Sequence, residues 1–320
     1  MAEVVLGLGV SHSPQMTVPW QSWEMLRKKD EGDHRLGYPD LLKNADPNLV
    51  AQVNPETWEQ RYSATQQAIK TVAKKLKAAE ADAIVIFGDD QHEQFDDTNM
   101  PAVAIFHGET FGLRKRRETP AGVSPWWSIE EENWEETKDE YPAQPDLAKH
   151  LIVSLTDQEF EITRCSELRP DVGVGHAFSW LYRRMWPECD VPVVPIMVNT
   201  YYPPNQPTPN RCYALGQAVR EAIGKWNGGK RVAVMASGGL SHIIMDEQLD
   251  RDFIDGMLKK DRAKMCAVPR PKLKGGTSEI LNWIAVAGAT EDLNPTLVSY
   301  QPGYRSPAAT GCGMGVAYWN

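Results

Sequence analysis

Residues 83–93 read AIVIFGDDQHE, in which an unbroken apolar run leads directly into a run of acidic, amide and imidazole side chains. An apolar run that does not alternate with polar residues is typical of a strand that is covered on both faces. Comparable runs rich in β-branched residues recur through the 320 residues, at 4–10, 102–106, 160–163, 191–198, 231–236 and 313–318. These runs predict the strands of a sheet that has helices on both sides.

Helical patterns lie between the predicted strands. Apolar residues recur at helical spacing in residues 58–76, and residues 210–226 repeat the pattern until Asn227-Gly228-Gly229 stops it. Shorter helices are expected at 146–155, 246–259 and 278–287. Interleaved strands and helices predict an α/β fold, which we interpret as a single large domain of residues 1–320 with a central mixed or largely parallel sheet flanked by helices. Two polar stretches with aromatic anchors, residues 20–56 and 120–142, are expected to be long loops folded over that domain.

The composition excludes several classes of protein. A formal net charge of -9 leaves no general basic excess to neutralise phosphates, so no nucleic-acid partner is expected. The five cysteines are dispersed and odd in number, which is typical of reduced thiols and not of a disulfide framework. The first residues do not match a signal peptide, and no stretch reaches the roughly 18 apolar residues of a membrane span. We therefore expect a cytoplasmic protein with no membrane association.

Polar clusters follow several of the predicted strands. They comprise residues 11–14, 89–93, 173–176, 199–204 and 237–242. Ligands of open α/β sheets bind beyond the carboxyl ends of the strands, so His12, His176 and His242 in these clusters are expected at one edge of the sheet. Each histidine alone is as readily explained as a structural hydrogen-bonding group. The spacing around Ser237 and Ser241 does not match a serine-hydrolase elbow, and the glycines do not form a phosphate loop.

Further motifs join these clusters in a fixed order along the chain. The set consists of GVSHSP at 9–14, Asp90-Gln91 followed by Phe95 and Met100-Pro101, Gly175-His176, Tyr202-Pro203-Pro204, RCYALG at 211–216, SGGLSH at 237–242, GTSEI at 276–280 and SPAA at 306–309. In order and spacing it resembles the class III extradiol ring-cleavage dioxygenases, of the type of the catalytic β-subunit of protocatechuate 4,5-dioxygenase. The similarity covers most of the chain.

The resemblance implies a site that holds Fe(II) with two histidines and one carboxylate. Such a facial set leaves open positions for O2 and for both oxygens of a catechol. By their motifs, His12 corresponds to the first histidine ligand and Glu279 to the ligand carboxylate. His242 corresponds to the histidine that acts as acid and base on the substrate hydroxyl, and His176 to a second pocket histidine that contacts the substrate. Without the resemblance, Glu279 would be read as a plain first-turn glutamate of a helix.

The second histidine ligand of the family has no direct counterpart. Without gaps its position falls on Gln91, whose neutral amide is a poor replacement for an imidazole. His92 is adjacent, and a one-residue shift would restore the histidine. Because a one-residue step in an extended segment turns the side chain to the opposite face, the shift requires a local bulge. Both residues stay open as the third metal ligand, and Glu247 is a spare carboxylate near His242 in the sequence.

Two functions are compatible with these residues. In the first, the chain is an extradiol ring-cleavage dioxygenase that uses non-heme Fe(II) and O2 on a phenolic or catechol-type aromatic. In the second, it is a metal-independent homologue in which His12, His176 and His242 transfer protons during hydrolysis, decarboxylation or tautomerisation of a phenolic or dicarbonyl compound. A non-catalytic relative ranks last, because three histidines and the carboxylate occupy matching positions. The resemblance also implies a small aromatic substrate, and either a homo-oligomer or a small partner subunit.

Overall fold

Four parallel strands form the middle of the sheet in the computed structural model, which describes residues 1–113, 138–226 and 228–320. In spatial order they are β1 (Glu3–Val10), β8 (Arg231–Ser237), β2 (Ala83–Asp89) and β7 (Val193–Val198). In β2, Ile84 and Ile86 enter the core on one face of the sheet, whereas Val85 and Phe87 enter the core on the other face. The unbroken apolar run is therefore the sequence of a strand that is buried on both sides.

Strands on both sides of this parallel centre make the sheet mixed. They are β3 (Val103–Phe106), β6 (Thr163–Cys165), β9 (His242–Ile244), β10 (Pro295–Tyr304) and β11 (Thr310–Trp319). Strand β3 is antiparallel to β7 and parallel to β6, while β11 is antiparallel to β1, β10 and β9. Among the described residues these nine strands form one sheet, and β4 (Thr110–Phe111) pairs separately with β5 (Tyr141–Pro142). The prediction of an α/β domain with a central mixed sheet is confirmed.

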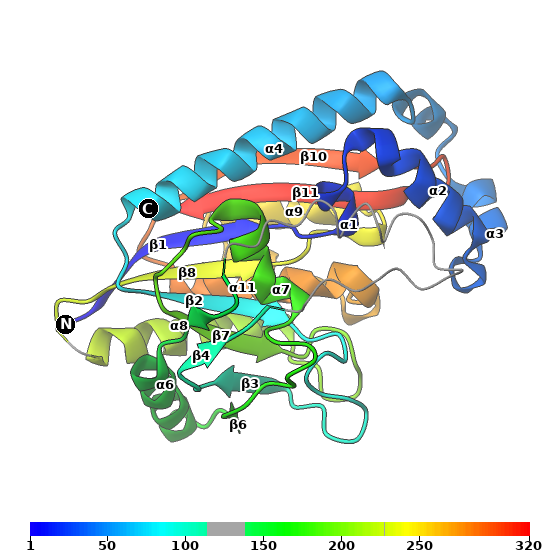
Figure 1. Ribbon diagram of the computed structural model, residues 1–320. Coiled ribbons are helices and arrows are strands. Elements are labelled where there is room, and N and C mark those ends of the chain that lie inside the picture. Colours follow the sequence, from blue (N-terminus) through cyan, green and yellow to red (C-terminus); the bar gives the residue numbers. More distant parts are fainter. Residues whose placement is uncertain (114–137, 227) are drawn as a thin grey trace.

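Helices cover both faces of the sheet. The longer ones are α4 (Pro55–Ala78), α6 (Pro145–Asp157), α8 (Pro209–Lys225), α9 (Glu247–Leu258) and α11 (Ile280–Ala289). Figure 1 shows α4 running along β10 and β11, and α7 (His176–Trp180) lies against β2 and β8 on the same face. The buried side chains of α6, α8, α9 and α11 fill the core on the opposite face.

Helices α8 and α11 meet at a close contact made by two glycines. A Cβ at Gly216 would lie 1.8 Å from the carbonyl oxygen of Ala285, and a Cβ at Gly288 would lie 2.2 Å from that of Tyr213. Only a hydrogen atom fits at either position, so backbone meets backbone here. Because α11 also packs on β1, β8 and β2, this contact helps to hold its first turn, next to Glu279, at the carboxyl edge of the central strands.

Residues 20–56, which the sequence predicts as a long loop, form two short helices, α2 (Trp23–Gly32) and α3 (Tyr38–Asn44), together with 3-10 turns. Trp23 is fully buried, and Asp30 forms an ion pair with a buried arginine. Few other side chains of the segment are buried, so its apolar periodicity is weak. Contacts with the rest of the fold therefore hold these helices in place, which propensity alone would not do.

The remaining described helices and helical turns are short. They are α1 (Pro14–Thr17), α10 (Arg262–Met265), η1 (Trp20–Ser22), η2 (His34–Leu36), η3 (Pro47–Gln52), η4 (Leu181–Met185), η5 (Arg270–Lys272) and η6 (Gly275–Glu279). The second predicted loop, residues 120–142, lies outside the described residues as far as residue 137, and its end contributes β5.

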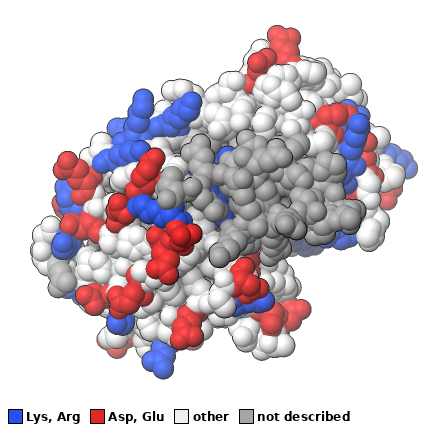
Figure 2. All heavy atoms as spheres, viewed as in Figure 1, with Lys and Arg blue, Asp and Glu red and all other residues white. Residues whose placement is uncertain are grey.

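The molecular surface carries charges of both signs. Figure 2 shows Lys and Arg side chains interspersed with Asp and Glu on the face that Figure 1 presents. Within the described residues, none of the helices is both long and apolar enough to cross a bilayer. All five cysteines are free, and three of them are buried.

Candidate functional site

Polar side chains gather where the four central strands end. The residues concerned are His12 after β1, Asp89 at the end of β2, Tyr201 beyond β7 and Ser237 at the end of β8. Helix α7 brings His176 to the same edge, and η6 brings Glu279. This edge is where open α/β sheets bind their ligands, and it is where the sequence predicts the site.

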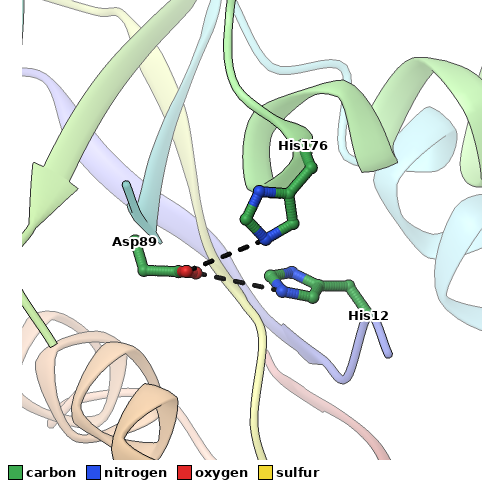
Figure 3. Close-up of side chains that lie close together, drawn as sticks. All are labelled: His12, Asp89 and His176. Carbon is green, nitrogen blue, oxygen red and sulfur yellow. Dashed lines mark ion pairs between the residues drawn. The ribbon is translucent and has the colours of Figure 1, made fainter. Parts of the chain in front are cut away.

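Two histidines of this edge face one carboxylate. Figure 3 shows the imidazole rings of His12 and His176 directed at the carboxylate of Asp89. His12 Nε2 lies 3.8 Å from Asp89 Oδ1, and His176 Nε2 lies 3.7 Å from Asp89 Oδ2. One ligand atom from each of the three residues lies within 4.8 Å of the others, which is close enough for a shared metal ion.

Glu279 joins this cluster from the turn before α11. Its Oε2 lies 3.2 Å from His12 Nε2 and accepts a hydrogen bond of 2.8 Å from the Gly239 N–H. Its Oε1 lies 3.5 Å from His242 Nε2 and accepts a hydrogen bond of 2.9 Å from the Tyr201 hydroxyl. The carboxylate is fully buried. The structure thus brings the first predicted ligand, the predicted ligand carboxylate and the predicted acid/base into one cluster.

Each histidine of the cluster is anchored through Nδ1. The partners are the Ser237 hydroxyl for His12 at 3.0 Å, the Glu93 carboxylate for His176 at 2.8 Å, and the Leu240 carbonyl for His242 at 3.1 Å. A carboxylate and a carbonyl can only accept, so in the neutral form of His176 and His242 the hydrogen lies on Nδ1. The lone pair on Nε2 of each ring is then directed at the cluster.

Gln91 occupies the centre of the cluster. Its Nε2 donates to Asp89 Oδ2 at 3.0 Å and to Glu279 Oε1 at 3.3 Å, and it lies 3.4 Å from His176 Nε2. An amide nitrogen carries two hydrogens and has no lone pair to offer. In this orientation Gln91 therefore links the two carboxylates and does not present a metal ligand.

His92 points away from the cluster. Its ring stacks on Tyr202, with the ring centroids 3.8 Å apart, and its Nε2 lies 3.2 Å from Asp97 Oδ1. The backbone of His92 has a φ of 59°, which is uncommon for a residue other than glycine and turns the chain after Gln91. The structure therefore brings Gln91, and not His92, to the other predicted ligands, and the shift that would move His92 inward does not occur.

Other carboxylates divide between the site and its surroundings. Glu247 lies outside the cluster, where it pairs with Arg251 and accepts a hydrogen bond from the Tyr304 hydroxyl. Sequence reasoning gave no role to Asp89 or Glu93, although both belong to a polar run that it singled out. That run was the signal in the sequence for these two residues. It could not assign a role to each member, because those roles depend on residues far away in the chain.

Burial and mutual repulsion dominate the electrostatics of the cluster. Burial, reinforced by the charge of Glu279, raises the pKa of Asp89 above its usual value. Burial also acts to raise the pKa of Glu279, but His242 and His12 outweigh it and hold that pKa well below its usual range. Burial acts to lower the pKa of His176, yet nearby carboxylates raise it to about 10. Two carboxylates in one buried pocket thus attract positive charge, either as protons on imidazole or as a cation.

Two buried polar atoms of the cluster have no hydrogen-bond partner. They are His12 Nε2 and Asp89 Oδ1. Leaving a buried polar atom unpaired costs roughly 1–3 kcal/mol, so such atoms at a polar site call for a partner. Imidazole nitrogen and carboxylate oxygen are ligands that suit divalent iron and manganese. The residues present therefore fit a divalent metal ion.

Three glycines make room for these side chains. Gly238 and Gly239 have φ values of 112° and 67°, which L side chains rarely adopt, and a Cβ at Gly238 would lie 2.5 Å from Glu279 Oε2. A Cβ at Gly276 would lie 1.9 Å from His242 Nε2. The Gly-Gly turn is therefore needed to let Glu279 approach, and Gly276 is needed to let the His242 ring sit beside it.

A mixed α/β sheet with buried histidines and carboxylates at the carboxyl edge of its strands defines an enzyme with metal-binding or acid–base capacity. Residues 46–313 match the family model described as the catalytic LigB subunit of aromatic ring-opening dioxygenase, and the chain belongs to that family. It is thus of the class III extradiol dioxygenase type, as the sequence resemblance implies.

Relatives with curated names agree with this family. The chain is 29% identical to a gallate dioxygenase of Pseudomonas putida over 178 residues, which is 52% of this chain and 50% of that protein. It is 26% identical to a 2,3-dihydroxyphenylpropionate/2,3-dihydroxicinnamic acid 1,2-dioxygenase of Dechloromonas aromatica over 185 residues, which is 56% of this chain and 51% of that protein. The chain spans about half the length of these curated relatives.

Proposed function

We propose that this protein is an extradiol ring-cleavage dioxygenase that acts on a catechol-type aromatic with O2 and non-heme Fe(II). The observation that supports it most directly is the contact of His12 and His242 with the two oxygens of the buried Glu279. In a member of this family, that contact joins two predicted metal ligands to the predicted acid/base. Since two relatives are named for gallate and for 2,3-dihydroxyphenylpropionate, we propose a substrate with adjacent phenolic hydroxyls.

His12 and Glu279 are the residues that we propose to hold the metal. Both ligand atoms lie in the cluster that fits a divalent ion, and His12 Nε2 has no other hydrogen-bond partner. Fe(II) bound there supplies adjacent coordination positions for the catechol oxygens and for O2.

His242 is proposed to accept the proton of a substrate hydroxyl at Nε2. Because Leu240 O holds Nδ1–H, the free lone pair of the neutral ring lies on Nε2, on the side of the cluster. His176 is proposed to contact the substrate from the other side of Asp89, with its ring fixed by Glu93. Both rings are held before substrate arrives, so no reorientation is needed at the moment of proton transfer.

The test of this function is oxygen uptake by the purified protein with a panel of catechols, after anaerobic loading with Fe(II). We expect O2 consumption in step with a yellow ring-fission product, and loss of both after chelation. Turnover that continues under chelation and without O2 would overturn the proposal. The panel includes aromatics with a single hydroxyl, which are expected to give no product.

Replacing Gly276 with alanine is expected to lower kcat/KM for ring cleavage by about 100-fold, the effect of displacing a reacting group by about 1 Å. The added Cβ would occupy the position of His242 Nε2 and force the ring aside. Metal content should stay at the wild-type level, since His242 is not a proposed ligand. Gly224→Ala is the matched control, because a Cβ at Gly224 meets nothing within 4 Å. An unchanged rate in Gly276→Ala would contradict this role of His242.

One observation favours the second function, a metal-independent homologue. The Gln91 amide donates hydrogen bonds to both carboxylates and thereby stabilises part of the negative charge that a cation would otherwise stabilise. His12, His176 and His242 would then transfer protons on a phenolic or dicarbonyl compound during hydrolysis, decarboxylation or tautomerisation. Chelation and exclusion of O2 separate the two functions, because only the metal-independent activity survives both treatments.

The wider setting of the enzyme follows from the same reasoning. We propose a small aromatic substrate and a cytoplasmic location. A homo-oligomer, or a complex with a small partner subunit, stays a prediction from the family resemblance, and the mass of the native protein by light scattering checks it.

A further inference from the structure

The third metal ligand of this site is the open question that the structure can address. The family position for it is Gln91, which directs its amide N–H groups, and not its carbonyl oxygen, at the carboxylates. His92 lies outside the cluster against Tyr202. Neither residue of the sequence-based alternative thus supplies the ligand in this arrangement.

Asp89 and His176 share the candidate metal cluster with His12, and of these two only Asp89 has a buried side-chain atom without a hydrogen-bond partner. Its Oδ1 is buried, has no hydrogen-bond partner and lies 3.8 Å from His12 Nε2, which also has none. Glu279 Oε2 lies 3.2 Å from the same nitrogen. Octahedral ligands about 2.1 Å from an ion lie about 3 Å from one another. Each of the two carboxylate oxygens therefore lies within about 1 Å of that separation from His12 Nε2.

We propose that Asp89 takes the place of the second histidine, so that a divalent ion is bound by His12, Asp89 and Glu279. The proposal rests on the proposed function only in that both require a divalent metal. One neutral imidazole and two carboxylates balance the charge of the ion, whereas two imidazoles and one carboxylate leave a single positive charge. Oxygen-rich sets suit manganese as well as iron, which makes Mn(II) a suitable probe.

Gln91 acquires a positioning role in this arrangement. It hydrogen-bonds Asp89 Oδ2 and Glu279 Oε1, and so it leaves the other oxygen of each carboxylate turned toward His12. His176 Nε2 lies beside the Oδ2 oxygen of Asp89, on the side occupied by Gln91. Partners of this kind orient ligands and typically change metal affinity by about 10–100-fold.

The test is a titration of the metal-stripped, full-length protein with Mn(II), followed by the electron paramagnetic resonance signal of the free ion. Asp89→Asn, which keeps the size and removes the charge, should weaken binding by at least about 100-fold, the upper limit for a residue that only positions ligands. Gln91→Ala should weaken it by roughly 10-fold, as a positioning residue does. His92→Ala is the matched control from the same loop and should bind as the wild type does. Binding that is unchanged in Asp89→Asn, or lost equally in Gln91→Ala, would overturn the proposal.

A second measurement on the unaltered protein removes any dependence on the folding of the variants. Spin-echo modulation of bound Mn(II) reports the number of coordinated imidazole nitrogens. We expect one, from His12, and two would overturn the proposal by adding His92 or His176. Failure of the proposed function is distinguishable, because it would appear as absent O2 uptake while the Mn(II) results still depend on Asp89.

Discussion

Replacing Glu279 with glutamine is expected to lower both metal affinity and kcat/KM for ring cleavage by at least about 100-fold. That factor is the upper end of the loss caused by removing a residue that only orients a metal ligand. The substitution keeps the shape of the side chain. An amide oxygen can still accept from the Gly239 N–H, and the Tyr201 hydroxyl can accept from the new amide group, so these two contacts are kept, while the Gln91 amide loses its acceptor at Oε1. What is lost is the negative charge opposite His12.

The amide has a second effect, on the acid/base. In the unaltered protein Glu279 Oε1 lies 3.5 Å from His242 Nε2. An amide nitrogen at that position would donate to the lone pair with which His242 is proposed to accept the substrate proton. The loss of kcat/KM is therefore expected to exceed the loss explained by metal content, and saturating Fe(II) should restore only part of it.

Metal analysis after anaerobic loading and oxygen uptake are the two measurements for this variant. Glu247→Gln is the matched control, because Glu247 is the nearby carboxylate that lies outside the cluster and pairs with Arg251. It should retain the wild-type metal content and rate within about twofold, as a partly exposed ion pair contributes little. A Glu279→Gln protein that keeps stoichiometric metal would contradict its role as a ligand, and one that turns over under chelation would favour the metal-independent function.

The centre of the fold could be predicted because its sequence signal is local. The apolar runs at 4–10, 83–87, 191–198 and 231–236 correspond to the four parallel strands. The predicted ends differ from the observed ends by at most two residues. Because both faces of these strands are covered, their sequences are unbroken apolar runs that are easy to recognise. A strand with one polar face would show an alternating pattern instead. The long amphipathic helices were predictable for a similar reason, since each buries one apolar stripe.

The strands at the two ends of the sheet order, β10 and β6, had a weaker signal. Most residues of β10 (Pro295–Tyr304) are half-buried, and Pro302 lies within it, as edge strands allow. The run at 160–163 predicted a strand, but the pairing with β3 begins at Thr163. An edge strand has one neighbour and one partly covered face, so its apolar content is low and its limits are set by where the partner ends.

The site shows the same division between local and distant causes. His12, His176, His242 and Glu279 each lie in a recognisable motif, and the structure brings them to one cluster. Asp89 has an equally local place at the end of a strand, yet its role depends on His12 and His176 reaching it from other elements. The choice between Gln91 and His92 depends on the backbone turn after Gln91, which the residue types do not specify.

Removing the guanidinium of Arg305 is expected to destabilise the fold by about 3–5 kcal/mol, the usual cost of breaking a buried ion pair. Arg305 precedes β11 and donates to both oxygens of Asp30 on α2, with Nε–Oδ2 at 2.6 Å and Nη2–Oδ1 at 3.1 Å. It also donates to Gln15 Oε1 at 3.1 Å. Both charged side chains are almost completely buried. Arg305→Ala therefore leaves the Asp30 carboxylate without its main partner.

The comparison that isolates this cost uses an exposed pair from the same region. Arg35 and Asp33 form an ion pair in which the arginine side chain is 73% exposed, so Arg35→Ala should cost at most about 1 kcal/mol. Urea unfolding of both variants measures the difference. The double variant Arg305→Met/Asp30→Leu should recover most of the stability, because apolar residues of similar volume often replace a buried pair without loss. Equal midpoints for Arg305→Ala and Arg35→Ala would show that the buried pair does not hold α2.

The same variant links the stability of α2 to the site. Gln15, which Arg305 contacts, lies in the short helix that follows His12 and donates to the carbonyl of Gly303 at 2.8 Å. Loss of Arg305 should therefore loosen the segment that carries His12 as well as α2. We expect Arg305→Ala to bind Mn(II) more weakly than wild type even at temperatures where it is fully folded, whereas Arg35→Ala should not. A folded Arg305→Ala protein with wild-type metal affinity would show that His12 is held by its own contacts alone.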